Sequence, residues 1–195
     1  MTDISRLREF VTGMTVLADT CDGNENAMIF GTRNFLRKLI SRDDWLPEEF
    51  TRDGQTYRQY LLHCDPKQRF SVVSFVWGPG QTTPVHDHMV WGLIGMLRGA
   101  EIGQRFASDG DGAMIPDVEE LLEQGDVEVV SPAMGDIHKV SNALSDKVSI
   151  SIHVYGANIG AVSRHVFDPE TGLPKEFISG YSNETVPNLW DLSES

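Results

Sequence analysis

A pair of histidines is the first feature of this sequence that could carry chemistry. His86 and His88 are separated by one residue in the segment GQTTPVHDH. On an extended strand this spacing turns both imidazoles to the same face, as the joint coordination of one metal ion requires. Exposed strands also carry such pairs by chance, so the pair alone leaves metal binding open.

A second polar group follows the alternation of residues 149–155. Ser151, His153 and Tyr155 alternate with β-branched apolar residues, so the polar and apolar sets lie on opposite faces of one strand. One interpretation is an edge strand with a solvated polar face. The other is that the polar face lines the cavity of a closed barrel, where the three side chains form a hydrogen-bonded relay.

The sequence around the histidine pair and a later segment resemble the two metal-binding motifs of cupins. Gly80 precedes His86 by six residues, as in the first motif. In the second segment Gly135 precedes His138, and Asn142 follows four residues later. The resemblance implies a small jelly-roll β-barrel in which His138 joins the pair as the third ligand of one divalent metal.

The chain departs from many cupins at Gly92, which stands where they place a fourth ligand, glutamate. Its absence leaves three neutral imidazoles and open coordination positions. Neutral ligands keep the full charge on a divalent ion, which favours an anionic substrate group such as a thiolate. Three histidines also suit zinc, so the ligand types alone do not name the metal.

The three histidines and the Ser-x-His-x-Tyr row together resemble the cysteine dioxygenase family, which are cupins that oxidise a thiol to a sulfinic acid with iron and O2. The likeness extends from about Tyr57 to Arg164. It implies Fe2+ as the cofactor, bound by His86, His88 and His138.

Within this family, mammalian-type members bind the substrate carboxylate with an arginine in the strand before the metal motif. Gln59 stands at that position here. The pattern is similar to that of the bacterial 3-mercaptopropionate dioxygenases, in which a glutamine occupies this position and a later arginine supplies the charge. Arg164 matches that arginine, so the resemblance implies substrate binding by Gln59, Arg164 and Tyr155.

The resemblance also implies the reaction. A small thiol carboxylic acid, with 3-mercaptopropionate favoured and cysteine as the alternative, would be converted to its sulfinic acid by O2. Tyr155, fixed by His153 and Ser151, would be the catalytic group that donates a hydrogen bond to O2 or orders the substrate. No cysteine lies near Gly92, so Tyr155 is expected to lack the cysteine crosslink of the mammalian members.

Two rival functions use the same fold. A cupin isomerase or hydrolase would use zinc or manganese as a Lewis acid and would not need O2. A cupin that only binds a small ligand, as in sensory domains of regulators, would need no chemistry at all. The three ligands together with the polar row favour an enzyme over the second rival.

The elements that must position these residues divide the chain into three parts within a single predicted cupin domain, residues 1–195. Apolar residues recur at helical spacing over residues 4–17 and again after residue 28, so residues 1–50 are expected to be mostly helical and to pack on the barrel. Short β-rich runs separated by turn signals over residues 51–165 predict the barrel. Residues 166–195 are richer in Pro, Gly and charge and are expected to wrap the surface as coil.

Composition narrows the partners. The chain has 195 residues, of which 40% are hydrophobic and 23% charged, as in ordinary globular proteins. A net charge of −13 disfavours nucleic acid and anionic membranes and leaves small molecules as the expected partner class. No apolar run approaches the roughly 18 residues of a membrane span. The N-terminus has no signal-like apolar region and the two cysteines form no CxxC pair, so a cytoplasmic location is expected, with the oligomeric state open.

Overall fold

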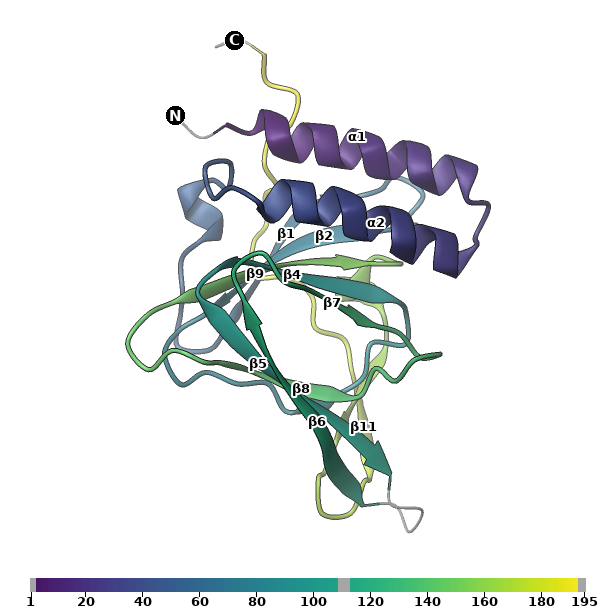
Figure 1. Cartoon of the computed structure of the whole chain (residues 1–195), viewed down its shortest axis with the longest axis vertical. Helices are drawn as coiled ribbons and strands as arrows, with labels where there is room; N and C mark the ends of the chain where they lie inside the picture. Colours follow the sequence, from purple (N-terminus) through teal and green to yellow (C-terminus); the bar gives the residue numbers. More distant parts are fainter. Residues whose placement is uncertain (1–2, 109–112, 193–195) are drawn as a thin grey trace.

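The computed structural model describes residues 3–108 and 113–192. Two helices, α1 (Ser5–Thr20) and α2 (Glu25–Ile40), lie side by side over one face of a β structure (Figure 1). Asn24 caps the start of helix α2, because its side chain accepts a hydrogen bond from the N–H of Ala27 at 3.1 Å. A 3-10 turn, η1 (Glu48–Phe50), precedes the first strand. The predicted helical N-terminal segment is confirmed.

The strands of the described residues form two antiparallel sheets, of five and six strands. The first sheet has the order β1 (Arg58–Cys64), β2 (Ser71–Trp77), β9 (Ser149–Tyr155), β4 (Gly92–Arg98) and β7 (Val127–Val130). The second has the order β11 (Pro174–Phe177), β10 (Arg164–Phe167), β3 (Val85–His86), β8 (His138–Asn142), β5 (Ala100–Ser108) and β6 (Met114–Glu123). This is the mainly β cupin architecture that the sequence predicts.

Both faces of β9 are buried, for different reasons. Ile150 and Ile152 belong to the hydrophobic cluster that the first sheet shares with α1 and α2. On the opposite face, His153 and Tyr155 line a cavity inside the barrel. Strand β2 does likewise, with Phe75 on the cavity side. The helices therefore cover the outer face of the first sheet, so its inner face is free to carry polar side chains into the barrel.

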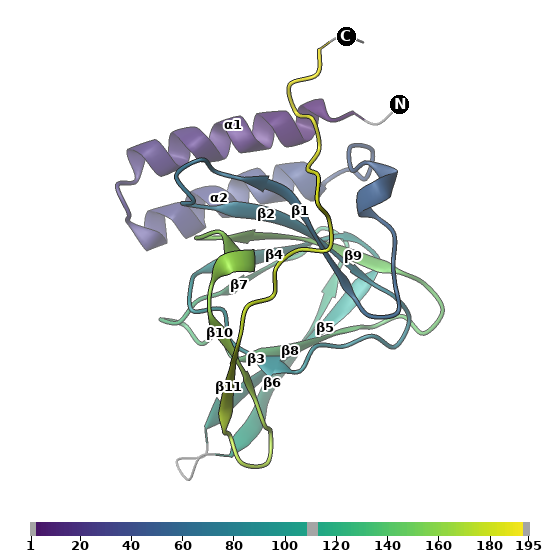
Figure 2. The same ribbon diagram turned by 180° about the vertical axis from the view of Figure 1, so that it is seen from behind.

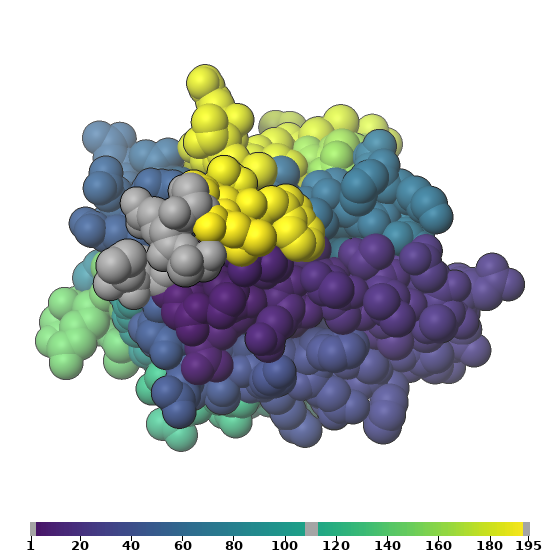
Figure 3. Space-filling model, turned by 90° about the horizontal axis from the view of Figure 1, so that it is seen from above, coloured from purple at the N-terminus to yellow at the C-terminus, as the bar shows by residue number. Residues whose placement is uncertain are grey.

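The C-terminal segment is not all coil, contrary to the prediction. After the 3-10 turn η2 (Ile159–Ala161), strands β10 and β11 pair with each other, Arg164 opposite Phe177. The chain then runs from β11 past β1 towards α1 (Figure 2). Seen from above, its last described residues lie against α1 (Figure 3), where Arg8 donates a hydrogen bond to the carbonyl of Leu189. The segment thus combines a strand with a surface wrap.

Two other features differ from the sequence expectation. Strand β3 ends at His86, so His88 lies just beyond it rather than on a continuous strand. Strands β5 and β6 form a long hairpin that extends from the lower end of the barrel in Figure 1.

Neither described helix has the length and apolar character needed to cross a membrane.

Candidate metal and substrate site

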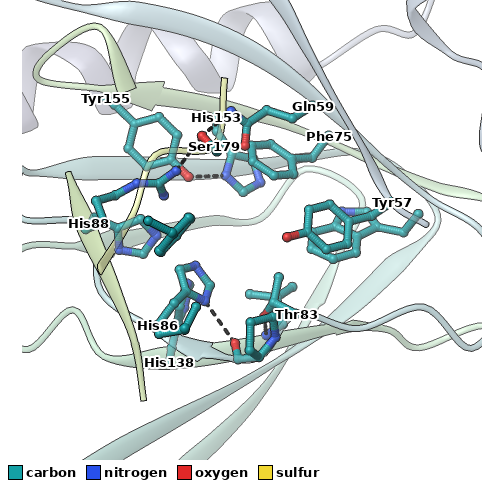
Figure 4. A pocket seen from close by; sticks show the side chains of 16 residues that line it. Tyr57, Gln59, Phe75, Thr83, His86, His88, His138, His153, Tyr155 and Ser179 are labelled. Atoms are coloured by element: carbon teal, nitrogen blue, oxygen red, sulfur yellow. Dashed lines mark hydrogen bonds between the residues drawn. The ribbon is translucent and has the colours of Figure 1, made fainter. Parts of the chain in front are cut away.

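Three histidines from two strands and a loop meet inside the barrel. His86 in β3 is paired in register with His138 in β8, and His88 follows β3 by two residues. One nitrogen from each ring lies within 4.8 Å of the others. Figure 4 shows the three rings grouped at one side of the cavity, with Tyr57 across from them. The structure therefore brings together all three predicted ligands.

The three imidazoles are in the form that binds metals. Burial lowers the pKa of each ring, to about 4 for His86 and well below the ordinary value for His88 and His138, whose histidine neighbours act in the same direction. All three are neutral at neutral pH, with a lone pair available for coordination.

Hydrogen bonding leaves nitrogens of these rings free for an ion. The carbonyl of Pro84 accepts from Nδ1 of His86 at 3.1 Å, which places the hydrogen on Nδ1 and the lone pair on Nε2. Both nitrogens of His88 and Nδ1 of His138 are buried without a hydrogen-bond partner among the described residues. Unsatisfied buried polar groups cost roughly 1–3 kcal/mol each. A divalent ion would satisfy a nitrogen on each ring, so the donor set fits a metal.

A carboxylate holds the loop that carries His88. Oδ2 of Asp136 accepts the backbone N–H of His88 at 3.0 Å and that of Met89 at 3.1 Å. Met89 has a φ of 61°, a left-handed conformation that a non-glycine residue rarely adopts unaided. Because Asp136 lies two residues before His138, this one side chain couples the second histidine to the third.

A second carboxylate, that of Asp87, links the segment of the first two histidines to strand β10, which carries Arg164. Oδ1 of Asp87 accepts the backbone N–H of His165 and Oδ2 lies against Nδ1 of the same histidine, both at 2.8 Å. Asp87 is the residue between the first two histidines, and His165 follows Arg164 in β10. The register of the two strands therefore fixes where Arg164 enters the cavity relative to the metal ligands.

Gly92 explains why the fourth ligand is missing. It lies opposite Tyr155 in the β4–β9 pair. A Cβ at Gly92 would approach Cδ1 of Tyr155 to 2.7 Å, which is closer than real Cβ contacts allow. The Tyr155 ring, 5.4 Å from the His88 ring between centroids, thus occupies the space that a side chain at position 92 would need. A side chain at position 92 would therefore require the Tyr155 ring to move.

The predicted relay is present. His153 lies between the two other members, with Nε2 at 2.8 Å from Ser151 Oγ and Nδ1 at 2.8 Å from the Tyr155 hydroxyl. Phe75 stacks on the His153 ring with centroids 4.1 Å apart, and Trp77 donates its ring N–H to Ser151 Oγ at 3.4 Å. Burial lowers the pKa of His153 to about 3 and raises that of Tyr155 above its ordinary value. Both side chains are therefore neutral at neutral pH.

A buried carboxyl group that the sequence did not indicate lies beside Ser149, at the start of strand β9. Glu101, at the start of β5, is 1% exposed, and the Ser149 hydroxyl donates to its Oε1 at 3.3 Å. Burial raises the pKa of Glu101 to about 8, although hydrogen bonding from Ser151 and Ser149 lowers it in part. The group is therefore mostly protonated at neutral pH.

The tautomer of His153 has a consequence for Tyr155. Ser151 Oγ accepts the ring N–H of Trp77, and the serine can give its own hydrogen to Nε2 of His153. Nδ1 of His153 then carries the ring hydrogen and donates to the Tyr155 oxygen. In this arrangement the hydrogen of the Tyr155 hydroxyl remains available to the cavity.

Arg164 enters the cavity as a buried cation. It is 3% exposed, its guanidinium lies 4.8 Å from the centre of the Phe177 ring, and its Nη2 donates to Ser179 Oγ at 2.7 Å. Within the described residues, Arg164 has no carboxylate within ion-pair distance and its Nε has no hydrogen-bond partner. Burial lowers the pKa of Arg164, which reflects the cost of holding this charge without a counter-ion.

Gln59 lies beside Arg164, as expected, but its amide group is already engaged. Nε2 of Gln59 donates to Ser179 Oγ at 3.0 Å and to the carbonyl of Gly180 at 2.7 Å. These two bonds use both hydrogens of the amide. Gln59 therefore supports the wall around Arg164 and has no free donor to offer.

The cavity that joins these groups measures about 230 Å³. Its described lining contains no aspartate or glutamate. Apart from the three histidines and the relay, the walls are apolar and aromatic with a few polar groups, and they are formed by Tyr57, Gln59, Phe75, Trp77, Thr83, Pro84, Val140, Arg164, Val166, Phe177 and Ser179. Such a space suits a small molecule with an anionic end near Arg164.

Comparison with known proteins agrees with this arrangement. A sequence model of the family described as cysteine dioxygenase type I matches residues 48–169, more than half of the chain. Cysteine dioxygenase type 1 of Bos taurus is 24% identical over 119 residues, which are 60% of this chain and 58% of that protein. The chain thus spans less than two thirds of that relative.

Two solved structures have a low similarity to this chain. An uncharacterised Klebsiella pneumoniae protein with a double-stranded β-helix domain has a TM-score of 0.46 and 19% identity, covering 58% of this chain and 89% of that one. A cupin 2 conserved barrel protein from Salinispora arenicola has a TM-score of 0.41 and 22% identity, covering 58% and 86% respectively.

Proposed function

Because the chain belongs to the cysteine dioxygenase type I family, we propose that it is a non-haem iron thiol dioxygenase acting on a small thiol carboxylic acid. The favoured substrate is 3-mercaptopropionate, with cysteine as the alternative. The reaction adds both atoms of O2 to the thiolate sulfur and yields the sulfinate, so no further reductant is needed.

The observation that carries the substrate proposal is the unpaired cation at one end of the cavity. Arg164 is buried, has no counter-ion among residues 3–108 and 113–192, and faces the same space as the three neutral histidines. A carboxylate bound by Arg164 would supply the missing charge, since guanidinium groups bind carboxylates through two parallel hydrogen bonds. The distance between the ends of the cavity then selects the chain length of the thiol.

The remaining roles follow from the side chains. An Fe2+ ion held by His86, His88 and His138 would supply the redox chemistry between thiolate and O2. Arg164 holds the substrate carboxylate and so orients the sulfur towards the histidines. Tyr155 directs its hydroxyl into the cavity, where it donates a hydrogen bond to the reacting oxygen or to the substrate.

Oxygen consumption tests this function. The protein is loaded with Fe2+ without air and then offered 3-mercaptopropionate, cysteine and cysteamine in parallel. The expected result is rapid O2 uptake with a carboxylate-bearing thiol, a product heavier than the substrate by two oxygen atoms, and little uptake with cysteamine, which lacks a carboxylate.

Matched variants distinguish the loss of a site residue from a general effect on the fold. His138→Ala is expected to abolish uptake, whereas His63→Ala removes a histidine of β1 that does not line the cavity and is expected to keep it. If no thiol supports O2 uptake, the dioxygenase proposal is wrong. A protein that instead retains zinc or manganese as purified, and consumes no O2, would favour the isomerase or hydrolase alternative.

A further inference from the structure

Among the described residues, the hydroxyl hydrogen of Ser179 has no hydrogen-bond acceptor. Its Oγ accepts one hydrogen bond from Arg164 at 2.7 Å and one from Gln59 at 3.0 Å. A serine oxygen has two lone pairs, so both are used and its own O–H must donate elsewhere. Ser179 lines the cavity, and its described lining contains no carboxylate.

The segment that carries Ser179 is fastened on two sides. Strand β11 pairs with β10, which places Phe177 opposite Arg164. Beyond it, the N–H of Ser182 donates to the carbonyl of Gln59 at 2.8 Å, and the Ser182 hydroxyl accepts the N–H of Gln59 at 3.0 Å. The side chain of Asn183 then bonds the N–H and the carbonyl of Leu61, at 2.8 and 2.9 Å.

Residues 177–183 are thus bonded to β10 of one sheet and to β1 of the other, so they bridge the two sheets beside the cavity (Figure 2). These residues lie beyond the part of the chain that matches the family model, which ends at residue 169. One wall of the cavity is therefore contributed by a segment whose sequence that match does not cover.

We propose that Ser179 is a substrate-binding residue that donates its hydroxyl to the carboxylate held by Arg164, and that Gln59 is a positioning residue acting through Ser179. Arg164 and Ser179 lie next to each other, so both can donate to the same carboxylate. Gln59 and Arg164 occupy the lone pairs of Ser179 and thereby direct its hydrogen away from both of them. This inference rests on the proposed function only for which molecule carries the carboxylate. That a carboxylate binds beside Arg164 is inferred from the unpaired charge in the cavity.

Equilibrium binding without O2 tests the proposal. Binding of 3-mercaptopropionate and of cysteamine to the Fe2+-loaded protein is measured by anaerobic titration calorimetry for the wild type, Ser179→Ala and Ser179→Thr. Hydrogen bonds to charged groups justify an expected loss of about 10- to 100-fold in affinity for 3-mercaptopropionate in Ser179→Ala. Cysteamine binding is expected to stay unchanged, and Ser179→Thr, which keeps a hydroxyl, is expected to recover most of the affinity.

The matched control is Ser163→Ala, which removes an exposed serine next to Arg164 that does not line the cavity. It is expected to bind both thiols as the wild type does. Equal affinity of Ser179→Ala and wild type for 3-mercaptopropionate would overturn the proposal, and so would an equal loss for both thiols, which indicates a structural role.

The two proposals can fail separately. A protein that consumes no O2, yet loses carboxylate-dependent binding in Ser179→Ala, retains this inference without the dioxygenase function. Normal O2 uptake with unchanged binding in Ser179→Ala refutes only the role of Ser179.

Discussion

Replacement of Glu101 by glutamine is expected to change how the stability of the protein depends on pH. The wild-type carboxyl is buried, and burial raises its pKa from 4.5 to about 8. Since the folded pKa lies above the unfolded one, the folded state binds more protons than the unfolded state between these two values. The contribution of Glu101 to the free energy of unfolding is fully present below pH 4.5 and is lost as the pH rises through about 8.

The magnitude follows from the pKa difference. Each pKa unit corresponds to about 1.4 kcal/mol, so the full shift corresponds to roughly 5 kcal/mol. About 2 kcal/mol of this falls between pH 6.5 and 8.5. The buried histidines of the site act in the opposite direction, because burial lowers their pKa and their contribution to stability therefore rises with pH across this window. They titrate alike in the wild type and in Glu101→Gln, so the difference between the two proteins isolates Glu101.

The assay is urea unfolding of chelator-treated protein at pH 6.5, 7.5 and 8.5, followed by circular dichroism. Glutamine has nearly the same shape as glutamic acid and does not titrate, so the stability of Glu101→Gln relative to the wild type is expected to rise by about 2 kcal/mol between pH 6.5 and 8.5. Glu123→Gln, at an exposed position in β6, is the control and is expected to parallel the wild type. If Glu101→Gln also parallels the wild type across this window, Glu101 does not hold its proton in the folded state.

Three further substitutions test the metal and substrate groups. His138→Ala is expected to reduce bound iron to near zero, as measured by elemental analysis, because it removes one of three ligands. Tyr155→Phe keeps the ring beside Gly92 but loses the hydroxyl, so iron content is expected to persist while O2 uptake falls by about 10- to 100-fold. Asp136→Ala removes the acceptor of two backbone N–H groups and is expected to weaken iron binding by about 10- to 100-fold in a chelator competition.

The fold could be predicted where local patterns reflect the tertiary environment. Strand β9 shows strict alternation because one face packs on helices and the other lines the cavity, and both demands are visible in the sequence. Strand β6 was not predicted from the sequence, because it is a mostly exposed edge strand whose conformation depends on pairing with β5. Strand β11 was not predicted either, because it is short, begins with Pro174 and forms only through pairing with β10.

The candidate site divides in the same way. The histidines and the relay could be predicted because their spacing is local and their motifs resemble a known family. Asp136, Glu101 and Ser179 could not, because their roles arise from contacts between residues far apart in the chain. Asp136 acts 48 residues from His88, and Ser179 lies 120 residues from Gln59. Only the folded chain shows that these polar groups share donors and acceptors.

The charge of the cavity connects these observations to substrate choice. Three neutral histidines leave the charge of a divalent ion unreduced, Arg164 adds a further positive charge, and the described lining contains no aspartate or glutamate. Gly92 has no side chain beside the Tyr155 ring, so position 92 adds no negative charge to the site. A ligand with a thiolate at one end and a carboxylate at the other supplies negative charge to both positive centres at once. Cysteamine satisfies one centre only and would leave Arg164 buried and unpaired, so the site is expected to discriminate by the second anionic group rather than by the thiol.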